Sequence, residues 1–350
     1  MLVKDLLHKD ANNLNLFRLI LASMVIYGHA PCFIDATGRT DFIANLVHFT
    51  YSGNLAVIMF FFISGILITN SLLVKQNWKS FILARLFRLI PGLIFVSAII
   101  GIICFYFTES NFITHLKIIW EYMYKNALLN IQFEMQGVNF LHDAHPLGGR
   151  YAAAINGSLW TIPIEFKMYL MILSVWFISK SIYPKLMPVL MIIGLLSPII
   201  FIEPLLGDGE VKFLIPSFML GALYAYYKDK INLNWQVAIG LFLLTNIVAG
   251  LIIKSWLYVV AFNTTMIWLS GTKLLTSFRI KHDISYGVYL WGWPIEQLVG
   301  YFMPWLHYWY FILVSIALTF IVAYISCRLV EEPSMNICKK IHKYEVLHVR

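Results

Sequence analysis

An arginine and a histidine lie eleven residues apart in the first apolar stretch of the chain, at Arg18 and His29. Eleven helical steps of about 100° return almost to the starting face, so both side chains point the same way, roughly 16 Å apart along the axis. Ionisable residues in a spanning helix are costly and usually face a cavity or a partner. Imidazole titrates near neutral pH, which suits His29 to general base chemistry. The alternative is that Arg18 snorkels to the interface and His29 bonds to a neighbouring carbonyl group.

A second pair of basic residues, Arg85 and Arg88, stands where the third apolar run begins. Arginines at positions i and i+3 share one face of a helix. A planar guanidinium group binds phosphate through two parallel hydrogen bonds, so two such groups side by side form a good phosphate site. The alternative is that both arginines only anchor a helix end at the membrane surface.

A third group of residues lies between Asn156 and Tyr169, around the fourth apolar run. Glu165 and Tyr169 are one helical turn apart and share a face. An unpaired carboxylate inside a spanning helix would be expensive, so Glu165 is expected to take part in chemistry or to pair with a positive charge. The alternative is a structural ion pair of Glu165 with Lys167 or with an arginine of another helix, because buried charges persist mainly when paired.

Long apolar runs must position these residues. Apolar residues make up 60% of the 350 positions and charged residues only 13%, against roughly 45–50% and about 25% in a soluble domain, so a water-soluble protein is excluded. A spanning helix needs about 20 mostly apolar residues. The sequence predicts an all-α polytopic bundle of about ten transmembrane helices, in a single membrane domain over residues 1–350. The expected spans are 16–34, 54–74, 88–108, 158–179, 186–202, 212–227, 235–253, 256–272, 285–303 and 308–328.

The positive charges set the expected orientation. With the N-terminus in the cytoplasm, 19 of the 26 Lys and Arg fall inside, six fall outside and Lys167 lies within a helix. This imbalance predicts an N-in, C-in topology and explains the net charge of +8 without a nucleic-acid partner. Residues 109–157 then form an extracytoplasmic loop, with His142, Asp143 and His145 in it, and 329–350 a cytoplasmic tail. The four cysteines show no paired spacing, so neither a metal site nor a disulfide framework is implied.

Six segments of the chain, taken in order, resemble a known family. They are the Arg18 and His29 pair, FFFISGILIT at 60–69, RLFRLIP at 85–91, SLWTIPIEF at 158–166, SYGVYLWGWP at 285–294 and EEP at 331–333. Together they resemble the acyltransferase-3 family of integral membrane O-acyltransferases, which are mostly bacterial and modify polysaccharides or lipid-linked glycans. The resemblance covers nearly the whole chain. One departure is Gly292, where the family often has histidine.

The resemblance implies a reaction and roles for residues. The donor would be an acyl-CoA, most often acetyl-CoA, with no bound cofactor. The acceptor would be a hydroxyl of a cell-surface or lipid-linked glycan, such as lipopolysaccharide O-antigen, capsule or exopolysaccharide, at the bacterial cytoplasmic (inner) membrane. We expect catalysis from His29 and Glu165, donor binding by Arg18, Arg85 and Arg88, and acceptor binding by Trp160, Tyr169 and Asn156. Trp160 offers an apolar face on which a sugar ring can pack.

Other functions and mechanisms fit parts of the same pattern. Buried Arg, His and Glu residues in about ten helices also describe a transporter or flippase. The sequence shows no inverted repeat, and the ordered motifs favour the enzyme. A structural subunit of a polysaccharide machine is a third possibility, and the presence of both Arg18 and His29 argues against it. Within the enzyme, direct transfer with His29 as the base competes with a transient acyl-imidazole.

Overall fold

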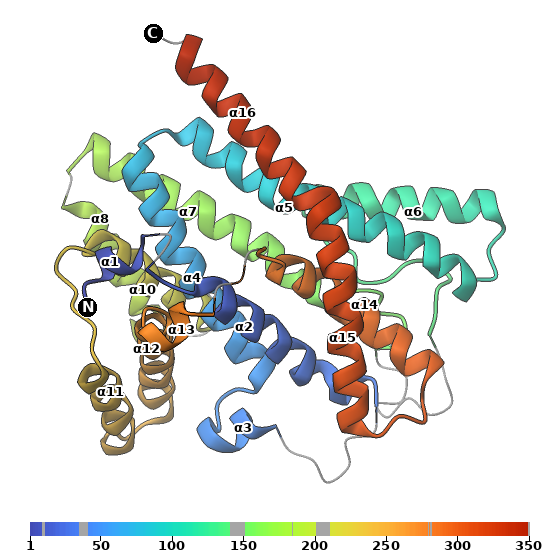
Figure 1. Cartoon of the computed structure of the whole chain (residues 1–350), viewed down its shortest axis with the longest axis horizontal. Helices are drawn as coiled ribbons and strands as arrows, with labels where there is room; N and C mark the ends of the chain where they lie inside the picture. Colours follow the sequence, from blue (N-terminus) through green and yellow to red (C-terminus); the bar gives the residue numbers. More distant parts are fainter. Residues whose placement is uncertain are drawn as a thin grey trace. The chain divides into compact units, whose positions relative to one another are not determined.

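The computed structural model describes residues 1–8, 11–34, 41–140, 151–183, 185–200, 211–278, 280 and 282–348. Within these ranges the regular structure is helical, and extended pairing is limited to three isolated bridges (Figure 1). The predicted all-α fold class is confirmed.

Helices occupy all ten runs that the sequence predicts as spans. Among the described residues, five helical segments are long and apolar enough to cross a membrane. They are Ser52–Lys75 (α4), Trp78–Phe107 (α5, Trp78–Ile103, with η2, Cys104–Phe107), Gly157–Ser181 (η3, Gly157–Trp160, with α7, Thr161–Ser181), Leu251–Ser270 (α12) and Tyr308–Ile341.

The other five helices at expected spans are not both long and apolar enough to count as candidate spans. Four of them are short, with 10 to 16 residues, whereas a full span needs about 20. The fifth, α14 (Ser285–Phe302), has 18 residues and carries Glu296. The structure therefore supports a membrane protein with five clear candidate spans. The four short helices are α2 (Leu14–His29), α8 (Leu186–Leu195), α10 (Leu214–Tyr226) and α11 (Trp235–Ile247).

The chain divides into two compact units. The first contains Met1–Leu21, Asp41–Trp78 and Lys167–Lys281, and the second contains Ala22–Thr40, Lys79–Phe166 and His282–Arg350. Besides the longer helices, the first unit includes α1 (Val3–Leu6), α3 (Phe42–Val47), α9 (Ser197–Ile200) and α13 (Lys273–Thr276).

Helices α4 and α10 form the core of the first unit through close backbone contact. A Cβ atom on Gly65 would lie 2.0 Å from the Phe218 carbonyl oxygen, and one on Gly221 would lie 2.2 Å from the Phe62 carbonyl oxygen. Ser217 adds an interhelical hydrogen bond by donating its hydroxyl to the Ile58 carbonyl at 2.7 Å. Small residues and such side-chain bonds are typical of helix packing in membranes.

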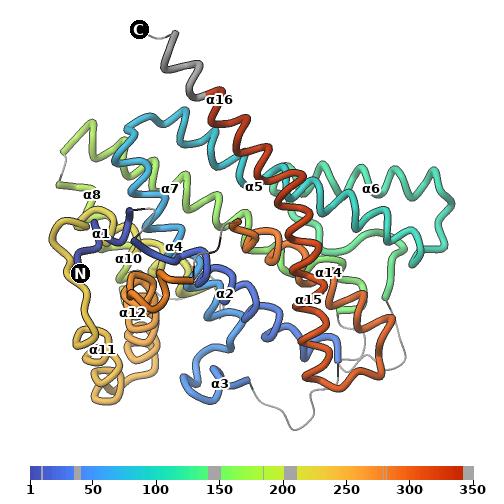
Figure 2. The backbone as a smooth tube through the Cα atoms, viewed as in Figure 1, coloured from blue at the N-terminus to red at the C-terminus, as the bar shows by residue number. Residues whose placement is uncertain are grey.

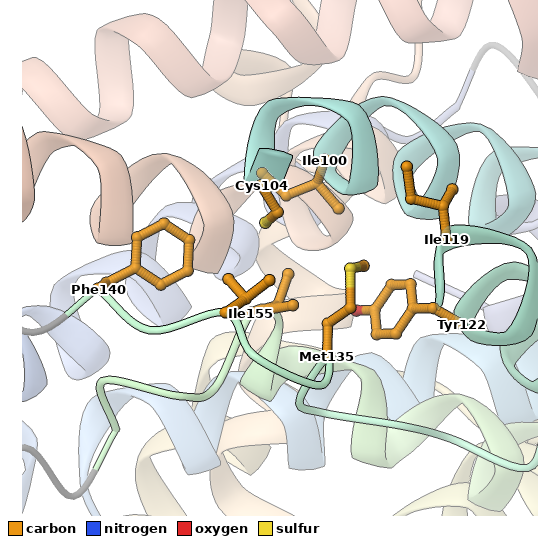
Figure 3. Packing of buried hydrophobic residues seen from close by; sticks show 8 residues of the cluster. Ile100, Cys104, Ile119, Tyr122, Met135, Phe140 and Ile155 are labelled. Carbon is orange, nitrogen blue, oxygen red and sulfur yellow. The ribbon is translucent and has the colours of Figure 1, made fainter. Parts of the chain in front are cut away.

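The second unit is organised by α14, α5 and α15 (Tyr308–Ser326), and it contains most of the candidate residues described below, including His29 and Arg88. It includes α6 (Phe112–Ala127), which packs against the end of α5 over a buried apolar cluster. Figure 3 shows this cluster, in which Ile119 and Tyr122 of α6 face Ile100 and Cys104. The interval 109–157, expected as a loop, therefore contains a packed helix.

The C-terminal part of the second unit is one long helical segment. Helix α15 continues through a π-helical turn, η6 (Cys327–Glu331), into α16 (Glu332–His348), as the tube in Figure 2 shows. Turns of the π type occur mostly inside α-helices and often at functional sites. Here the turn holds Glu331, the first residue of the EEP motif, with its side chain buried.

Candidate active site

His29 ends α2 and faces a carboxylate that is fully buried. Its Nδ1 atom lies 3.9 Å from Oε2 of Glu296 on α14, and the Glu296 side chain is 0% exposed. Neither this nitrogen nor either Glu296 oxygen has a hydrogen-bond partner among the described residues. Buried polar groups are normally hydrogen-bonded, and exceptions often mark catalytic sites or an absent ligand. The pair is thus close enough to interact and incompletely satisfied.

The His29 ring is fixed by an aromatic side chain of α14. Its ring centroid lies 5.0 Å from that of Trp293, with the two planes nearly perpendicular at 74°. Trp293 in turn donates its Nε1 hydrogen to the Ala154 carbonyl at 2.8 Å. A Cβ atom on Gly157 would lie 2.7 Å from the Trp293 ring, so this glycine permits the close packing. Residues 156–160 (NGSLW) therefore pack on the SYGVYLWGWP segment beside the histidine.

Gly292, where the family often has histidine, lies in close contact with α2. A Cβ atom at this position would lie 3.1 Å from Cγ1 of Ile26 on α2. That separation is tighter than an ordinary van der Waals contact, so a larger residue would require Ile26 to shift. In this chain the position serves close packing of α14 on α2, and the imidazole of the site comes from His29.

The start of α7 is bonded to α14 one turn before Trp293. Tyr289 donates its hydroxyl to the Ser158 carbonyl at 2.6 Å and lies 2.5 Å from the Thr161 hydroxyl. Because a phenol has a single proton, Thr161 is the donor in the second bond. Asn156 caps η3 by accepting from the Ser158 amide and donates to the Leu290 carbonyl at 2.9 Å. These bonds fix the motif that carries Glu165.

The candidate residues of this motif have different environments. Asn156 is buried and engaged in the two bonds above, whereas Trp160 and Glu165 are partly exposed. Glu165 is close enough to the Tyr289 hydroxyl to interact with it electrostatically. Lys167, the alternative partner for Glu165, is exposed. Tyr169 is buried and belongs to the first unit.

Arg88 lies in a second charged cluster, where α5 meets the start of α14 and the π-helical turn. Its guanidinium nitrogens are 3.2 Å from Oδ2 of Asp283 and 3.6 Å from Oε2 of Glu331. The guanidinium carbon also lies 5.3 Å from the centroid of the Tyr286 ring. Tyr286 donates its hydroxyl to the Leu89 carbonyl at 2.8 Å. Arg88 is therefore held by two carboxylates and an aromatic face.

A cavity of about 320 Å³ opens beside Arg88. This volume is at the lower end of the range for small-molecule sites, which is about 300–1,000 Å³. Its walls combine cationic and anionic groups, so any anion that binds Arg88 would compete with the carboxylates. The lining residues are Arg88, Asp283, Cys327, Glu331, Glu332, Met335, Asn336 and Lys339.

A smaller polar cavity of about 150 Å³ lies beside α6. It offers both hydrogen-bond donors and acceptors, from Glu121, Lys125, Gln132, Glu134 and Gln136. The backbone of Glu134 pairs with that of Ala154, whose carbonyl accepts from Trp293. This cavity is thus joined through the backbone to the segment that supports the His29 ring.

The remaining predicted residues are placed as follows. Arg18 lies eleven residues before His29 in the same uninterrupted helix α2, as the spacing predicts, and belongs to the first unit. Arg85 lies one turn before Arg88 on α5 and is partly exposed. His142, Asp143 and His145 of the expected outer loop lie outside the described residues.

Glu296 and Asp283 are site residues that were not predicted from the sequence. Glu296 is the only Asp, Glu, Lys or Arg in α14, and an ionisable residue in an apolar helix is itself a signal of function. That signal was present in the sequence. Asp283 precedes α14 and gives no comparable signal, because a carboxylate before a helix commonly serves as a cap. It does accept from the Ser285 amide and hydroxyl.

Comparison with known proteins identifies the family of the chain. A model of the acyltransferase-3 family, described as an acyltransferase domain, matches residues 12–328. The helical fold and the five segments long and apolar enough to cross a membrane fit an integral membrane acyltransferase. The chain belongs to the acyltransferase-3 family. Its expected family membership and its class as an acyltransferase are confirmed.

Two relatives match over most of their length. An "O-acetyl transferase" of Shigella phage Sf6 is 27% identical over 308 residues, covering 84% of this chain and 86% of the phage protein. "Nodulation protein 10" of Rhizobium leguminosarum bv. viciae is 26% identical over 356 residues, covering 93% and 94%. No solved structure matches the chain. The names and the family together support a membrane O-acyltransferase.

Proposed function

We propose that this protein transfers an acetyl group from acetyl-CoA in the cytoplasm to a glycan hydroxyl on the other side of the bacterial inner membrane. The observation that carries the proposal is the His29 and Glu296 pair, with an imidazole 3.9 Å from a buried carboxylate at the end of α2. The name of the phage relative supports acetyl as the group transferred. A bundle of about ten spans with both termini inside is part of the proposal.

His29 acts as the general base in this mechanism. It accepts the proton of the acceptor hydroxyl as the oxygen attacks the thioester carbonyl. The carbon–sulfur bond then breaks, and the proton passes to the departing CoA thiolate. Glu296 faces Nδ1, so it orients the ring and stabilises the imidazolium that forms, as an orienting carboxylate does in other acyl transfer sites. The contact of 3.9 Å shortens to a hydrogen bond in the reactive complex.

The donor site in this proposal uses arginines on α2 and α5. Arg18 lies roughly 16 Å before His29 along α2, a length that suits the extended pantetheine arm. Arg85 and Arg88 contribute guanidinium groups for the phosphates. The cavity beside Arg88 supports this role by offering space next to a cation. Arg88 would exchange a carboxylate partner for phosphate as the donor binds.

The acceptor site in this proposal lies on the extracytoplasmic side, formed by the segment that contains α6 and by the start of α7. Trp160 and Glu165, together with Asn156 and Tyr169, are its candidates at the start of α7. The polar cavity beside α6 adds donors and acceptors of the kind that bind sugar hydroxyls. The cavity is linked through the Glu134 and Ala154 backbones to Trp293, which packs on His29. This link supports a path for the glycan from the cavity to His29.

Isotope labelling tests the function directly. Membranes from cells expressing the wild-type chain, supplied with acetyl-CoA carrying a ¹³C-labelled acetyl group, should yield glycans with labelled O-acetyl esters by mass spectrometry. Mild alkali should remove the label, because it cleaves esters and leaves amides. Membranes with the His29→Ala variant are the matched control. Equal labelling in wild-type and control membranes, or label only in amides, would contradict the proposal.

A further inference from the structure

Helix α6 presents three different faces, one of which is apolar and exposed. Residues three or four positions apart form this face, since such positions are neighbours on a helix. Phe112 is 62% exposed and Trp120 is 66% exposed. We call this surface the aromatic face; it consists of Phe112, Ile113, Leu116, Trp120 and Tyr124, all of them exposed.

The rotation of α6 is fixed by its buried face. Ile119 and Tyr122 pack into the apolar cluster with Ile100 and Met135 (Figure 3). Two polar side chains on the buried side are also bonded. His115 is 2.9 Å from the Gly101 carbonyl through Nε2, and Asn126 accepts from the Gln132 amide at 2.7 Å. The helix cannot turn to hide its aromatic face without breaking these contacts.

The third face of α6 is polar. Lys117 and Glu121 are exposed, and Glu121 forms an ion pair with Lys125 one turn further on. Viewed down the axis at about 100° per residue, these residues lie between the buried and the aromatic faces. A helix with a polar face and an apolar face, neither hidden in a protein core, is the pattern of a helix lying in a membrane surface.

The aromatic face of α6 lies next to other exposed apolar residues, which are found at the end of the candidate span formed by α5 and η2. Helix α5 ends with exposed Ile102, and η2 then presents exposed Phe105 and Tyr106. The Tyr106 ring is 6.0 Å from that of Phe302 at the end of α14. Exposed Trp305 follows in the turn to α15, and exposed Trp309 lies in the first turn of α15. Exposed Trp and Tyr residues collect at membrane–water interfaces.

We propose that α6 is an interfacial helix, with its aromatic face inserted among the lipids at the membrane surface where α5 ends. A spanning position does not suit this helix, because charged residues are costly inside a membrane and its polar face carries three of them. Lipid is the occupant that fits, because the face is continuous with the apolar end of a candidate span and carries no charge of its own. Lys117, Glu121 and Lys125 remain in water.

Site-directed spin labelling tests this position without any measurement of acyl transfer. The full chain is reconstituted in phosphatidylcholine and phosphatidylglycerol vesicles with a nitroxide on Trp120→Cys or, as the matched control, on Glu121→Cys of the polar face. The unsubstituted chain measures labelling of the native cysteines. Collision rates are measured with oxygen, which concentrates in lipid, and with a water-soluble nickel chelate.

The two faces should respond in opposite directions. The label at Trp120→Cys should favour oxygen over the nickel chelate several-fold more than the label at Glu121→Cys, and it should match one at Ile102→Cys. Equal access of both labels to the nickel chelate would place the aromatic face in water and overturn the proposal. Protection of Trp120→Cys from both reagents would show that a second copy of the chain covers the face, which would also overturn it.

Discussion

Two charged clusters in the second unit pair a basic residue with carboxylates, yet they are built differently. Arg88 lies 3.2 Å and 3.6 Å from two carboxylates and beside a cavity. His29 lies 3.9 Å from one carboxylate that is fully buried, and neither group is hydrogen-bonded in the described part of the chain. The ion pairs of Arg88 link α5 to the start of α14 and to the π-helical turn. The histidine pair leaves polar atoms unsatisfied, and in our proposal these atoms take part in proton transfer.

The two clusters also differ in how they affect the free energy of folding. A buried carboxylate without hydrogen bonds is destabilising, and proteins keep such groups mainly where function needs them. Arg88 is partly exposed and well paired, so its cluster can be explained by stability alone. The comparison therefore predicts that changes at His29 and Glu296 affect turnover, whereas changes at Arg88 affect donor binding and stability together.

The largest effect is expected at His29. Replacing it with alanine removes the base, and general base catalysis contributes about 10²–10⁴-fold to rate. His29→Ala should therefore lower acyl transfer by about 10³-fold, to near background, in a labelled acetyl-CoA assay. The amount of protein in the membrane should not change. Wild-type activity in this variant would remove His29 from the mechanism.

Glu296→Gln is expected to have the next largest effect. Loss of an orienting carboxylate costs about 10⁴-fold in a serine protease triad, and the longer contact here leads us to expect about 10²-fold in kcat. The KM for the donor should stay constant, and the pH profile of kcat should change because the carboxylate no longer faces the imidazole.

Thermal unfolding in detergent distinguishes this role from a structural one. Removing an unsatisfied buried charge should leave the Tm unchanged or raise it. A fall in Tm that parallels the loss of activity would instead show that Glu296 supports the fold. An unchanged kcat would separate Glu296 from the reaction.

Arg88→Ala should act on donor binding. Hydrogen bonds to charged groups contribute about 1.5–3 kcal/mol, so the KM for acetyl-CoA should rise about tenfold or more. Arg88→Lys should restore only part, because lysine keeps the charge and loses the planar fork. Arg328→Ala is the matched control, since Arg328 makes an exposed ion pair with Glu332 nearby. An equal rise in KM for both alanine variants would indicate a general charge effect.

The smallest effect is expected at Trp293. Trp293→Phe keeps a ring against His29 and loses the 2.8 Å bond to the Ala154 carbonyl. A neutral hydrogen bond contributes about 1 kcal/mol, so kcat should fall about fivefold. Trp305→Phe, at a position that is 76% exposed, is the control and should leave the rate unchanged. A larger fall in kcat in the control than in Trp293→Phe would show that turnover does not depend on the position of the Trp293 ring.

Much of the helical arrangement was predictable because it depends on local composition. Apolar runs correctly located helices at all ten expected spans, and the spacing of Arg18 and His29 was correctly assigned to one helix. Helix length was harder to predict. Helix α2 ends at His29, where a 3-10 turn follows, and α8, α10 and α11 are short. Five segments therefore qualify as candidate spans among the described residues.

The partners of the basic residues were not predictable in the same way. Glu296 and Asp283 reach His29 and Arg88 through contacts between helices distant in the sequence. Helix α6 was missed for a different reason. A search for long apolar runs does not detect an amphipathic helix, in which apolar residues such as Trp120 alternate with Lys117 and Glu121.

The central claim is that acetyl groups from cytoplasmic acetyl-CoA reach an acceptor on the opposite side through His29. Sealed inverted vesicles test it, because their outer face is the cytoplasmic face. Labelled acetyl-CoA in the bath should modify only a glycan trapped in the lumen, and vesicles with the His29→Ala variant should modify none. Labelling of a membrane-impermeant glycan supplied in the bath would show that both substrates use the cytoplasmic face, and it would contradict the claim.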